Sequence, residues 1–515
     1  MRHIILAAAL ALAACATAPD PMLEVSLDVP INSEILPPFE SVITLTGEIT
    51  RADHQTYREL PFNVPPGTKL IAVAFSYNKD NRTVIDLGLR DPQGQRGWSG
   101  GNKDRFTVGN ISATPSYRAG PIQPGEWKLI LGIPNVRENQ TATYEATITL
   151  SNPRPTRFDP DDFFPPNPPT VLTAAPGWYR GDFHTHTAHS DGSCDAGAAR
   201  IPCPPQRTFE AARDASLDFV AITDHNTITQ LPEINAYQAQ FPETLLIPGT
   251  EITTFNGHAN VIGNTSFLDF QLGSARLPTL APLLDEAAAQ GAFVSVNHPG
   301  LPSGEVCMGC GWTVKDTDWS RVTAIEVANG SSLRTGGPAA GIRFWDNLLK
   351  QGYRLTAIGG SDNHDATDRA GAKQPPIGSP TTIVYASELS TKAIIAGVKS
   401  GRVFIDLANL PAAKLETSAH AGQQTISMGG QLILASDDRA TLDTTTMGLP
   451  PGATLTLIAN NLVINGAATS QLDNAPSQVS LTLTPGATSA YIRPEIRDAA
   501  GKILLIGNPI YIRPR

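Results

Sequence analysis

Histidine and acidic residues recur at the ends of short apolar segments between residues 184 and 364, and this recurrence constrains the fold more than any other feature. Seven of the ten histidines lie in this interval. The short apolar segments predict strands and the stretches between them predict helices, so the interval favours parallel strands joined by crossover helices. In α/β barrels of this kind the catalytic groups lie at the carboxyl ends of the strands. We therefore expect one concave site built from several strand ends.

The expected strands and helices alternate along residues 178–406, and their number suits a barrel of about seven strands. The expected strands cover residues 179–184, 218–223, 245–251, 259–263, 293–297, 324–328 and 355–360. The expected helices cover residues 208–216, 280–290, 338–350 and 390–399.

The strand ends carry residue types that bind metal ions. His184 and His186 are two residues apart on a strand, so both imidazoles face the same side. Asp191 follows on a turn where Gly192 lets the chain pass close to the site. Further candidates lie at the other strand ends, namely His225, Glu251, His258, His298, Asp362 and His364. A lone histidine at a strand end is usually an ordinary polar residue, but this many coincidences favour a metal site.

The series H-x-H, S-D-G, D-H, E, H, H-P and D-x-H resembles the motif pattern of the PHP family, named for polymerase and histidinol phosphatase. The resemblance covers residues 178–406 and implies a distorted (β/α)7 barrel. It gives Asp224 a role in orienting a ligand rather than in binding metal. It implies three cation positions: one with His184, His186, Glu251 and Asp362, one with Glu251, His258 and His298, and one with Asp191, His225 and His364.

Two or three divalent cations are therefore expected, and mixed nitrogen and oxygen ligands suit Zn²⁺, Mn²⁺ or Fe²⁺. Such cations would generate hydroxide near Glu251 and polarise the bond under attack. Asp365 or His189 is a candidate proton donor for the leaving group. Arg334 and Arg369 are candidates for gripping a phosphate or carboxylate, with ordinary surface arginines as the alternative.

The flanking regions predict β-domains. Residues 22–152 and 410–515 alternate apolar and polar residues in short runs separated by turn residues, which is typical of β-sandwich-like domains. Residues 153–177 contain eight prolines and predict an extended linker.

Four segments of the N-terminal region narrow the resemblance. They are DLGLRDP at 86–92, RGWSGG at 96–101, ATPSY at 113–117 and PGEW at 124–127. They resemble PHP-related metallohydrolases of the carbaryl-hydrolase (CehA/McbA) type, which carry such a leading domain, whereas the polymerase and histidinol-phosphatase branches lack it. The alternative is a generic sandwich with common turn residues.

The first fifteen residues predict export. Residues 4–14 are an unbroken apolar run, too short to span a bilayer but suited to a signal peptide. The ending Leu12-Ala13-Ala14-Cys15 resembles a bacterial lipobox, which implies a signal peptide over residues 1–15, a lipid on Cys15 and anchoring in the cell envelope, in the periplasm or outer membrane. Plain secretion is the alternative.

Four further cysteines allow two interpretations. In an oxidising compartment they predict the disulfides Cys194–Cys203 and Cys307–Cys310. The C-x-x-C spacing at 307–310 allows a four-cysteine zinc site instead.

Three functions fit the sequence. The first is a phosphoesterase, the second is a carbamate or carboxyl-ester hydrolase, and the third is a non-catalytic cell-surface binding protein. The first two imply a small-molecule ester substrate. The net charge of −10 argues against nucleic acid as a partner. The sequence indicates no oligomeric state.

Overall fold

The computed structural model describes residues 39–153, 171–305, 307–335, 337–435, 438–460, 462–463, 469–471, 477–483 and 490–515. The expected signal peptide, Cys15 and residues 154–170 of the expected linker lie outside these residues. The span Pro38–Arg515 forms one compact unit. Strands account for 43% of the described residues and helices for 14%, so sheets dominate the fold.

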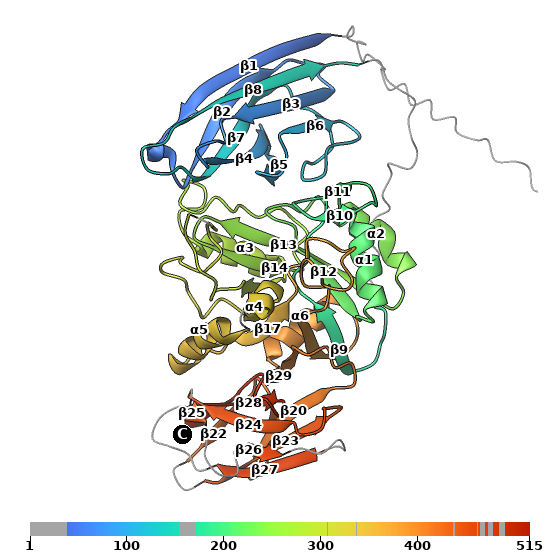
Figure 1. Cartoon of the computed structure of the whole chain (residues 1–515), viewed down its shortest axis with the longest axis vertical. Helices are drawn as coiled ribbons and strands as arrows, with labels where there is room; N and C mark the ends of the chain where they lie inside the picture. Colours follow the sequence, from blue (N-terminus) through green and yellow to red (C-terminus); the bar gives the residue numbers. More distant parts are fainter. Residues whose placement is uncertain are drawn as a thin grey trace, which may run out of the picture. The chain divides into compact units, whose positions relative to one another are not determined.

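Residues 39–153, called here the N-terminal sandwich, form two antiparallel four-stranded sheets (Figure 1, blue to teal). The first has the order β1(Glu40–Ile49), β8(Ala142–Ser151), β3(Leu70–Tyr77) and β6(Arg105–Gly109). The second has the order β2(Thr56–Val64), β7(Gly125–Asn135), β4(Val84–Asp91) and β5(Gly94–Gly100). Buried side chains from both sheets, including Trp127, Ile71 and Ile148, share one core. The apolar alternation of the sequence therefore corresponds to the inward faces of the strands.

Seven strands of the central region lie side by side in one sheet and carry the predicted ligand motifs. Their order is β17(Thr356–Gly360), β16(Ala324–Asn329), β15(Phe293–Val296), β14(Gly257–Ile262), β13(Leu245–Thr254), β12(Phe219–Ile222) and β9(Gly177–Asp182). These strands match the seven expected strands in place and order.

The expectation of parallel strands throughout is wrong for β14. This strand pairs antiparallel with both β13 and β15. The connection between β13 and β14 is only Phe255 and Asn256, and a connection this short makes a hairpin, because a parallel pair needs a crossover of a dozen residues or more. The pairs β9–β12, β12–β13, β15–β16 and β16–β17 are parallel, as expected.

The closed (β/α)7 barrel is not confirmed, because β9 does not pair with β17 along its length. Instead β9 pairs with β18(Thr381–Ala386), and β18 pairs with β19(Val403–Asp406). Beyond the strand ends, however, the chain after β9 bonds to the chain after β17. The amide of Asp362 donates to the carbonyl of His184 at 2.8 Å, and the amide of His186 donates to the carbonyl of Asn363 at 2.9 Å. These bonds bring two predicted ligand motifs together.

Helices cover the central strands. Four of them match the expected helices to within three residues at their ends: α1(Pro205–Asp214), α3(Ala281–Ala289), α5(Ala339–Lys350) and α6(Thr391–Ser400). The short helices were not expected: α2(Leu231–Tyr237), α4(Gly330–Thr335) and the 3₁₀ turns Arg51–Asp53 and Gln238–Gln240. Ser390 caps the N-terminus of α6, because its hydroxyl accepts a hydrogen bond from the amide of Ala393. Gly401, with φ 74°, caps the C-terminus. Within the described residues, no helix has the length and apolarity needed to cross a membrane.

Part of the C-terminal region continues the central sheet. Strand β19 pairs with β29(Ile503–Gly507), which leads to β28(Ala490–Arg497), β24(Thr454–Ala459) and β25(Leu462–Val463). The other strands here are β20(Lys414–Ala421), β21(Gln424–Ser427), β22(Gln431–Leu434), β23(Ala440–Met447), β26(Thr469–Gln471), β27(Ser477–Leu483) and β30(Ile510–Pro514). Strands β20, β21, β23 and β27 form a separate four-stranded antiparallel sheet, whereas β29, β28, β24 and β25 extend the central sheet beyond the boundary expected between residues 406 and 410.

Both expected disulfides are present. Cys194–Cys203 joins the hairpin of β10(Ser193–Asp195) and β11(Arg200–Pro202), and Cys307–Cys310 closes a short loop. The four cysteines are thus divided between two bonds and do not form a zinc site.

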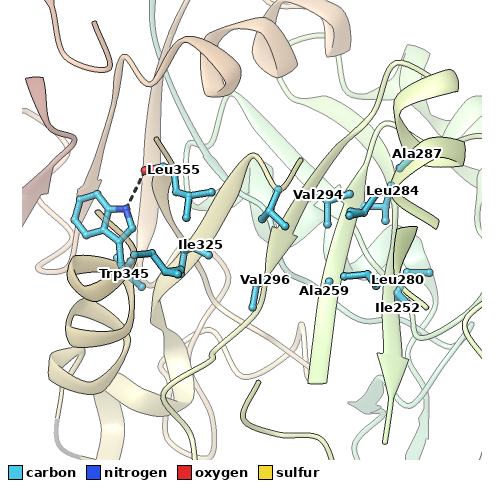
Figure 2. Packing of buried hydrophobic residues seen from close by; sticks show 14 of the residues in the cluster. Ile252, Ala259, Leu280, Leu284, Ala287, Val294, Val296, Ile325, Trp345 and Leu355 are labelled. Atoms are coloured by element: carbon cyan, nitrogen blue, oxygen red, sulfur yellow. Dashed lines mark hydrogen bonds between the residues drawn. The ribbon is translucent and has the colours of Figure 1, made fainter. Parts of the chain in front are cut away.

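Trp345 belongs to the buried core beneath the strands that carry the predicted ligands. Figure 2 shows it in a buried cluster with residues of β13 to β16 and α3, among them Ile252, Val296 and Ile325. The indole nitrogen of Trp345 donates to the carbonyl of Leu355 at 2.9 Å, so its one polar atom is satisfied.

We expect Trp345→Ala to lower the free energy of unfolding by about 3–5 kcal/mol, because it leaves a large cavity and an unpaired carbonyl. Chemical denaturation checks this. Phe344→Ala, at a half-buried neighbouring position of the same helix, is the control and should cost less. Equal losses for the two variants would contradict the assignment of Trp345 to the core.

Candidate metal centre

All nine predicted ligand residues lie in one cluster. Four overlapping groups of these side chains hold their ligand atoms within 4.8 Å of one another. The groups are His186, Asp191, His225 and His364; His184, His186 and Glu251; His184, His298 and Asp362; and Glu251, His258 and His298. Sequence segments almost two hundred residues apart therefore meet at one place.

The first implied cation position is formed by two strand ends and by β13. The nitrogen Nε2 of His184 lies 3.3 Å from Oε1 of Glu251 and 3.2 Å from Oδ1 of Asp362. The nitrogen Nε2 of His186 lies 3.4 Å from Oε2 of Glu251 and 3.1 Å from the same Asp362 oxygen. Two ligands bound at about 2.1 Å to a tetrahedral cation lie roughly 3.4 Å apart, so these spacings fit a shared cation.

The second implied position depends on the unexpected hairpin. In the β13–β14 pairing Thr253 lies opposite His258, so His258 lies near Glu251 on the neighbouring strand. Oε1 of Glu251 is 3.3 Å from Nδ1 of His258 and 3.5 Å from Nε2 of His298. The antiparallel strand β14 thus supplies a ligand that a parallel strand would have carried to the opposite end of the sheet.

The third implied position is more exposed. Oδ1 of Asp191 lies 3.3 Å from Nε2 of His364, 3.7 Å from Nε2 of His225 and 3.8 Å from Nδ1 of His186. Gly192 is required here, because a Cβ at this residue would lie 2.7 Å from the Cα of Thr187. This agrees with the expectation that glycine lets the Asp191 turn pass close to the site.

The donor set fits divalent cations. Nε2 of His184, Oδ1 of Asp191 and Oε2 of Glu251 are buried and form no hydrogen bond within the described chain. Buried polar atoms without a partner are costly, and here all three face other ligand atoms. Imidazole nitrogens and carboxylate oxygens together suit Zn²⁺, Mn²⁺ or Fe²⁺.

Neighbouring groups fix the orientation of the imidazoles. Nδ1 of His184 lies 2.9 Å from Oε1 of Glu326, and Nδ1 of His298 lies 2.6 Å from the carbonyl oxygen of Cys310. Nδ1 of His364 lies 2.9 Å from the carbonyl oxygen of Asp362. Such bonds hold the opposite ring nitrogen toward a cation and raise its basicity.

The charges of the cluster are strongly coupled. Burial alone lowers the pKa of His364, but the Asp191 carboxylate outweighs it and raises that pKa to about 10. Burial, together with the positive charges of His364 and His225, lowers the pKa of His186 to about 4. Burial would raise the pKa of Glu251, but the surrounding histidines hold it well below its usual range. Bound divalent cations would supply the positive charge that protonated imidazoles otherwise provide.

Asp224 fills the supporting role implied by the resemblance. Its Oδ1 accepts from the amide of Thr187 at 2.8 Å and from the hydroxyl of Ser190 at 2.7 Å. It therefore holds the loop that leads to Asp191.

The structure does not support Asp365 as the proton donor. Oδ2 of Asp365 lies 2.6 Å from a guanidinium nitrogen of Arg200. Burial would raise the pKa of Asp365, but the Thr367 hydroxyl and Arg200 lower it, so the carboxylate stays ionised at neutral pH. Both ring nitrogens of His189 also have partners outside the ligand set, with Nδ1 2.7 Å from the Thr229 hydroxyl and Nε2 2.9 Å from Glu233.

The two arginines expected to grip an anion are engaged elsewhere. Arg334 donates to the carbonyls of Gly371 and Ala372, at 3.2 and 3.4 Å. Arg369 pairs with Asp214 of helix α1 at 3.4 Å. Sequence position at a strand end did not fix where these long side chains point.

Glu326 is a site residue that the sequence reasoning missed. It lies on β16 and is 2% exposed. Its Oε1 contacts His184, and its Oε2 accepts a hydrogen bond from the amide of His298 at 2.9 Å. Asn329, three residues on, donates to Glu326 and to Asp362, each at 3.2 Å. The available signal was an acidic residue inside the apolar strand AIEVAN, because charged residues are seldom buried without a partner.

A cavity adjoins the cluster on the side of α4 and α5. Its volume is about 270 Å³, and His298, Glu326 and Asn329 line it on the polar side. Leu301, Val327, Ala339 and Ala340 supply apolar lining, and Arg343 is its cationic residue. The cavity can hold a small organic group next to the predicted ligands.

Comparison with known proteins gives only remote likenesses. No protein-family model matches the chain, and no curated protein matches it. Among solved structures, a two-domain protein from Bacteroides vulgatus containing a predicted PHP-like metal-dependent phosphoesterase is 20% identical, covers 65% of this chain and 95% of its own, and has a TM-score of 0.36. A candidate metal-dependent phosphoesterase from Bifidobacterium adolescentis is 16% identical, covers 38% and 92%, and has a TM-score of 0.25. A periplasmic inhibitor of g-type lysozyme from Aeromonas hydrophila is 11% identical, covers 21% and 85%, and has a TM-score of 0.15.

We expect Glu326→Gln to weaken cation binding by about 10–100-fold, because it removes the carboxylate that orients His184 and makes it more basic. Competition with a chromophoric chelator measures the affinity. Glu233→Gln is the matched control, since Glu233 also contacts a histidine, His189, but lies outside the cluster. If both variants bound cations like the wild type, Glu326 would have no supporting role.

Proposed function

We propose that this chain is a metal-dependent hydrolase of small-molecule esters, with phosphoesters as the preferred class and a PHP-type centre as its active site. The observation that supports this most is the convergence of nine predicted ligand residues on one cluster of buried and half-buried side chains. Bound divalent cations supply hydroxide at neutral pH and polarise the bond under attack. No serine or cysteine nucleophile is then required.

Glu251 is the central residue of the proposed centre. Oε1 faces His184, His258 and His298, and Oε2 faces His186 and His225. One carboxylate is therefore shared by the first and second implied positions, and it also contacts His225 of the third. Asp362 contributes a second carboxylate whose Oδ2 is held by Asn329. Asp362 has φ 56°, a left-handed conformation that is costly for a residue with a side chain and that recurs at functional sites.

Phosphoesters suit the charge of this centre. Arg334 and Arg369 bond elsewhere, so an anionic group would be held by the cations themselves. The adjoining cavity, with its apolar lining and Arg343, would take the organic part of the ester. Cations held by the residues of the three implied positions would neutralise the negative charge of a phosphoryl group better than that of an uncharged ester.

A carbamate or carboxyl-ester hydrolase is the second candidate. The four N-terminal segments that resemble the carbaryl-hydrolase branch favour it. A non-catalytic cell-surface binding protein is the third candidate, and the completeness of the ligand set argues against it, because no implied position has lost a residue.

The assay that separates these candidates uses aryl phosphates beside aryl carbamates, with Mn²⁺, Fe²⁺ or Zn²⁺ added to purified protein of measured metal content. We expect two or three equivalents of metal and faster turnover of the phosphates. Faster turnover of the carbamates would favour the second candidate. Stoichiometric metal with no turnover on either panel would favour the binding protein.

We expect Asp362→Asn to lower kcat/KM at least about 100-fold, since it removes a ligand charge from the centre. Asp365→Asn, three residues away, should keep most of the activity and an unchanged pH profile, because Asp365 bonds to Arg200. A large loss in Asp365→Asn with an altered basic limb of the pH profile would restore Asp365 as the proton donor.

We also propose that the protein acts in the cell envelope, tethered by a lipid on Cys15. The two disulfides support an oxidising compartment. Cys15→Ala should move the protein from the membrane fraction to the soluble fraction of the bacterial cell. An unchanged distribution on immunoblots of the two fractions would count against the anchor.

A further inference from the structure

Two N-terminal segments that have no role in the proposed chemistry, RGWSGG at 96–101 and ATPSY at 113–117, lie next to the candidate metal centre. Residues 187–191, called here the Asp191 loop, connect the His184 and His186 segment with Asp191. Three consecutive carbonyls of this loop accept hydrogen bonds from the N-terminal sandwich. Lys103 donates to the carbonyls of Ala188 and Ser190, at 3.3 and 3.1 Å. The hydroxyl of Ser116 donates to the carbonyl of His189 at 2.6 Å.

Ser116 is held for this contact by two of the motifs. It has φ 86° and is 0% exposed, a conformation that few residues with a side chain adopt. The Trp98 amide donates to its carbonyl at 3.1 Å, and a Cβ at Gly97 would lie 2.6 Å from the same oxygen. Lys103 donates to the Ser116 hydroxyl at 3.0 Å. The RGWSGG and ATPSY segments therefore form one support beneath Ser116.

Aromatic contacts hold the two regions together around this support. Trp98 of the sandwich packs on Phe270 with ring centroids 4.8 Å apart, and Tyr57 stacks on Phe255 at the same distance. Phe255 lies in the hairpin connection between β13 and β14, close in sequence to Thr253 and His258. Trp98 and Ile130 belong to the hydrophobic cluster of the central strands. This packing keeps Lys103 and Ser116 fixed against the loop.

Charges from the sandwich reach the same cation position. Burial lowers the pKa of Lys103, and the carboxylates of Asp224 and Asp191 oppose that shift. Burial raises the pKa of Asp86, on β4, to about 7, and the positive charge of His225 opposes the rise. For Lys103 the geometry agrees, because its Nζ lies 3.1 Å from the carbonyl oxygen of Ser190, the residue before Asp191.

We propose that Lys103 and Ser116 are positioning residues for the third cation position, acting through the Asp191 loop, so that the N-terminal sandwich is a working part of the metal centre. This inference rests on the proposed metal centre. Asp224 holds the Thr187 amide on one side of the loop, while the sandwich holds the carbonyls of the next three residues on the other. Loss of the contacts from the sandwich would let Asp191 move away from His225 and His364. It would leave Glu251, His258 and His298 in place.

The direction in which metal affinity changes in a Lys103 variant distinguishes a positioning role from a purely electrostatic one. Lys103 is a cation beside a cation position, so removing its charge alone would strengthen metal binding. Removing its hydrogen bonds would release the loop and weaken binding. Weaker binding in a Lys103 variant therefore indicates positioning.

The test titrates Zn²⁺ into the full-length protein after chelation, with a competing chromophoric chelator and elemental analysis of bound metal. We expect Lys103→Met to weaken one binding step by about 10–100-fold and to leave the others unchanged. Ser116→Ala should weaken the same step less. Lys128→Met is the matched control, because Lys128 belongs to the sandwich but pairs with Glu59 at 2.8 Å.

A double-mutant cycle assigns the weakened step. In a His364→Gln background, Lys103→Met should have no further effect, because both substitutions act on the same cation position. Equal weakening of all steps, no change, or tighter binding in Lys103→Met would overturn the inference. Should Lys103→Met fail to fold, Ser116→Ala and Lys103→Gln carry the same comparison.

Because no hydrolysis is measured, the two proposals fail in different ways. Wild-type protein that binds no Zn²⁺ would remove the metal centre itself. Wild-type binding with an unaltered Lys103→Met variant would leave the metal centre intact and remove only the role of the sandwich.

Discussion

The fold depends on how the charge of Glu251 is compensated. Its carboxylate is 1% exposed, and five histidines have ring nitrogens within 3.5 Å of it. A buried carboxylate is tolerated only where opposite charge and hydrogen bonds surround it. The strands must therefore end so that all five imidazoles reach one point, and this requirement accounts for the bonds between the chain after β9 and the chain after β17. Stability and chemistry are set by the same few atoms.

Sequence patterns predict local features here better than they predict pairing. All seven expected central strands are present, and all nine expected ligand residues converge, because strand ends and ligand spacing are local properties of the chain. The direction of β14 escaped prediction, since a two-residue connection was hidden between two apolar segments. Glu326 escaped as well, because its importance comes from His184, which is 142 residues away. The contacts of Asp365, Arg334 and Arg369 depend on partners that no spacing rule identifies.

The N-terminal sandwich shows why a leading domain can be tied to the chemistry of the domain behind it. Its motif residues fall into two classes. Gly97 and Trp98 build a support around Ser116, and Lys103 and Ser116 present donors from that support to the central region. A rigid support loses little conformational entropy when it makes these contacts, which makes it suitable for holding a loop that has no strand partner of its own.

The pairing of β19 with β29 bears on how this chain could be shortened. A protein ending after β19 would expose a row of unpaired amides and carbonyls along that strand, which is a template for joining other chains. It would also uncover Phe404 and Ile383, which are now 1% and 2% exposed under the C-terminal strands. The C-terminal strands thus cover an edge that would otherwise pair with other chains, and a shortened soluble protein has to retain them or carry charged residues along that edge.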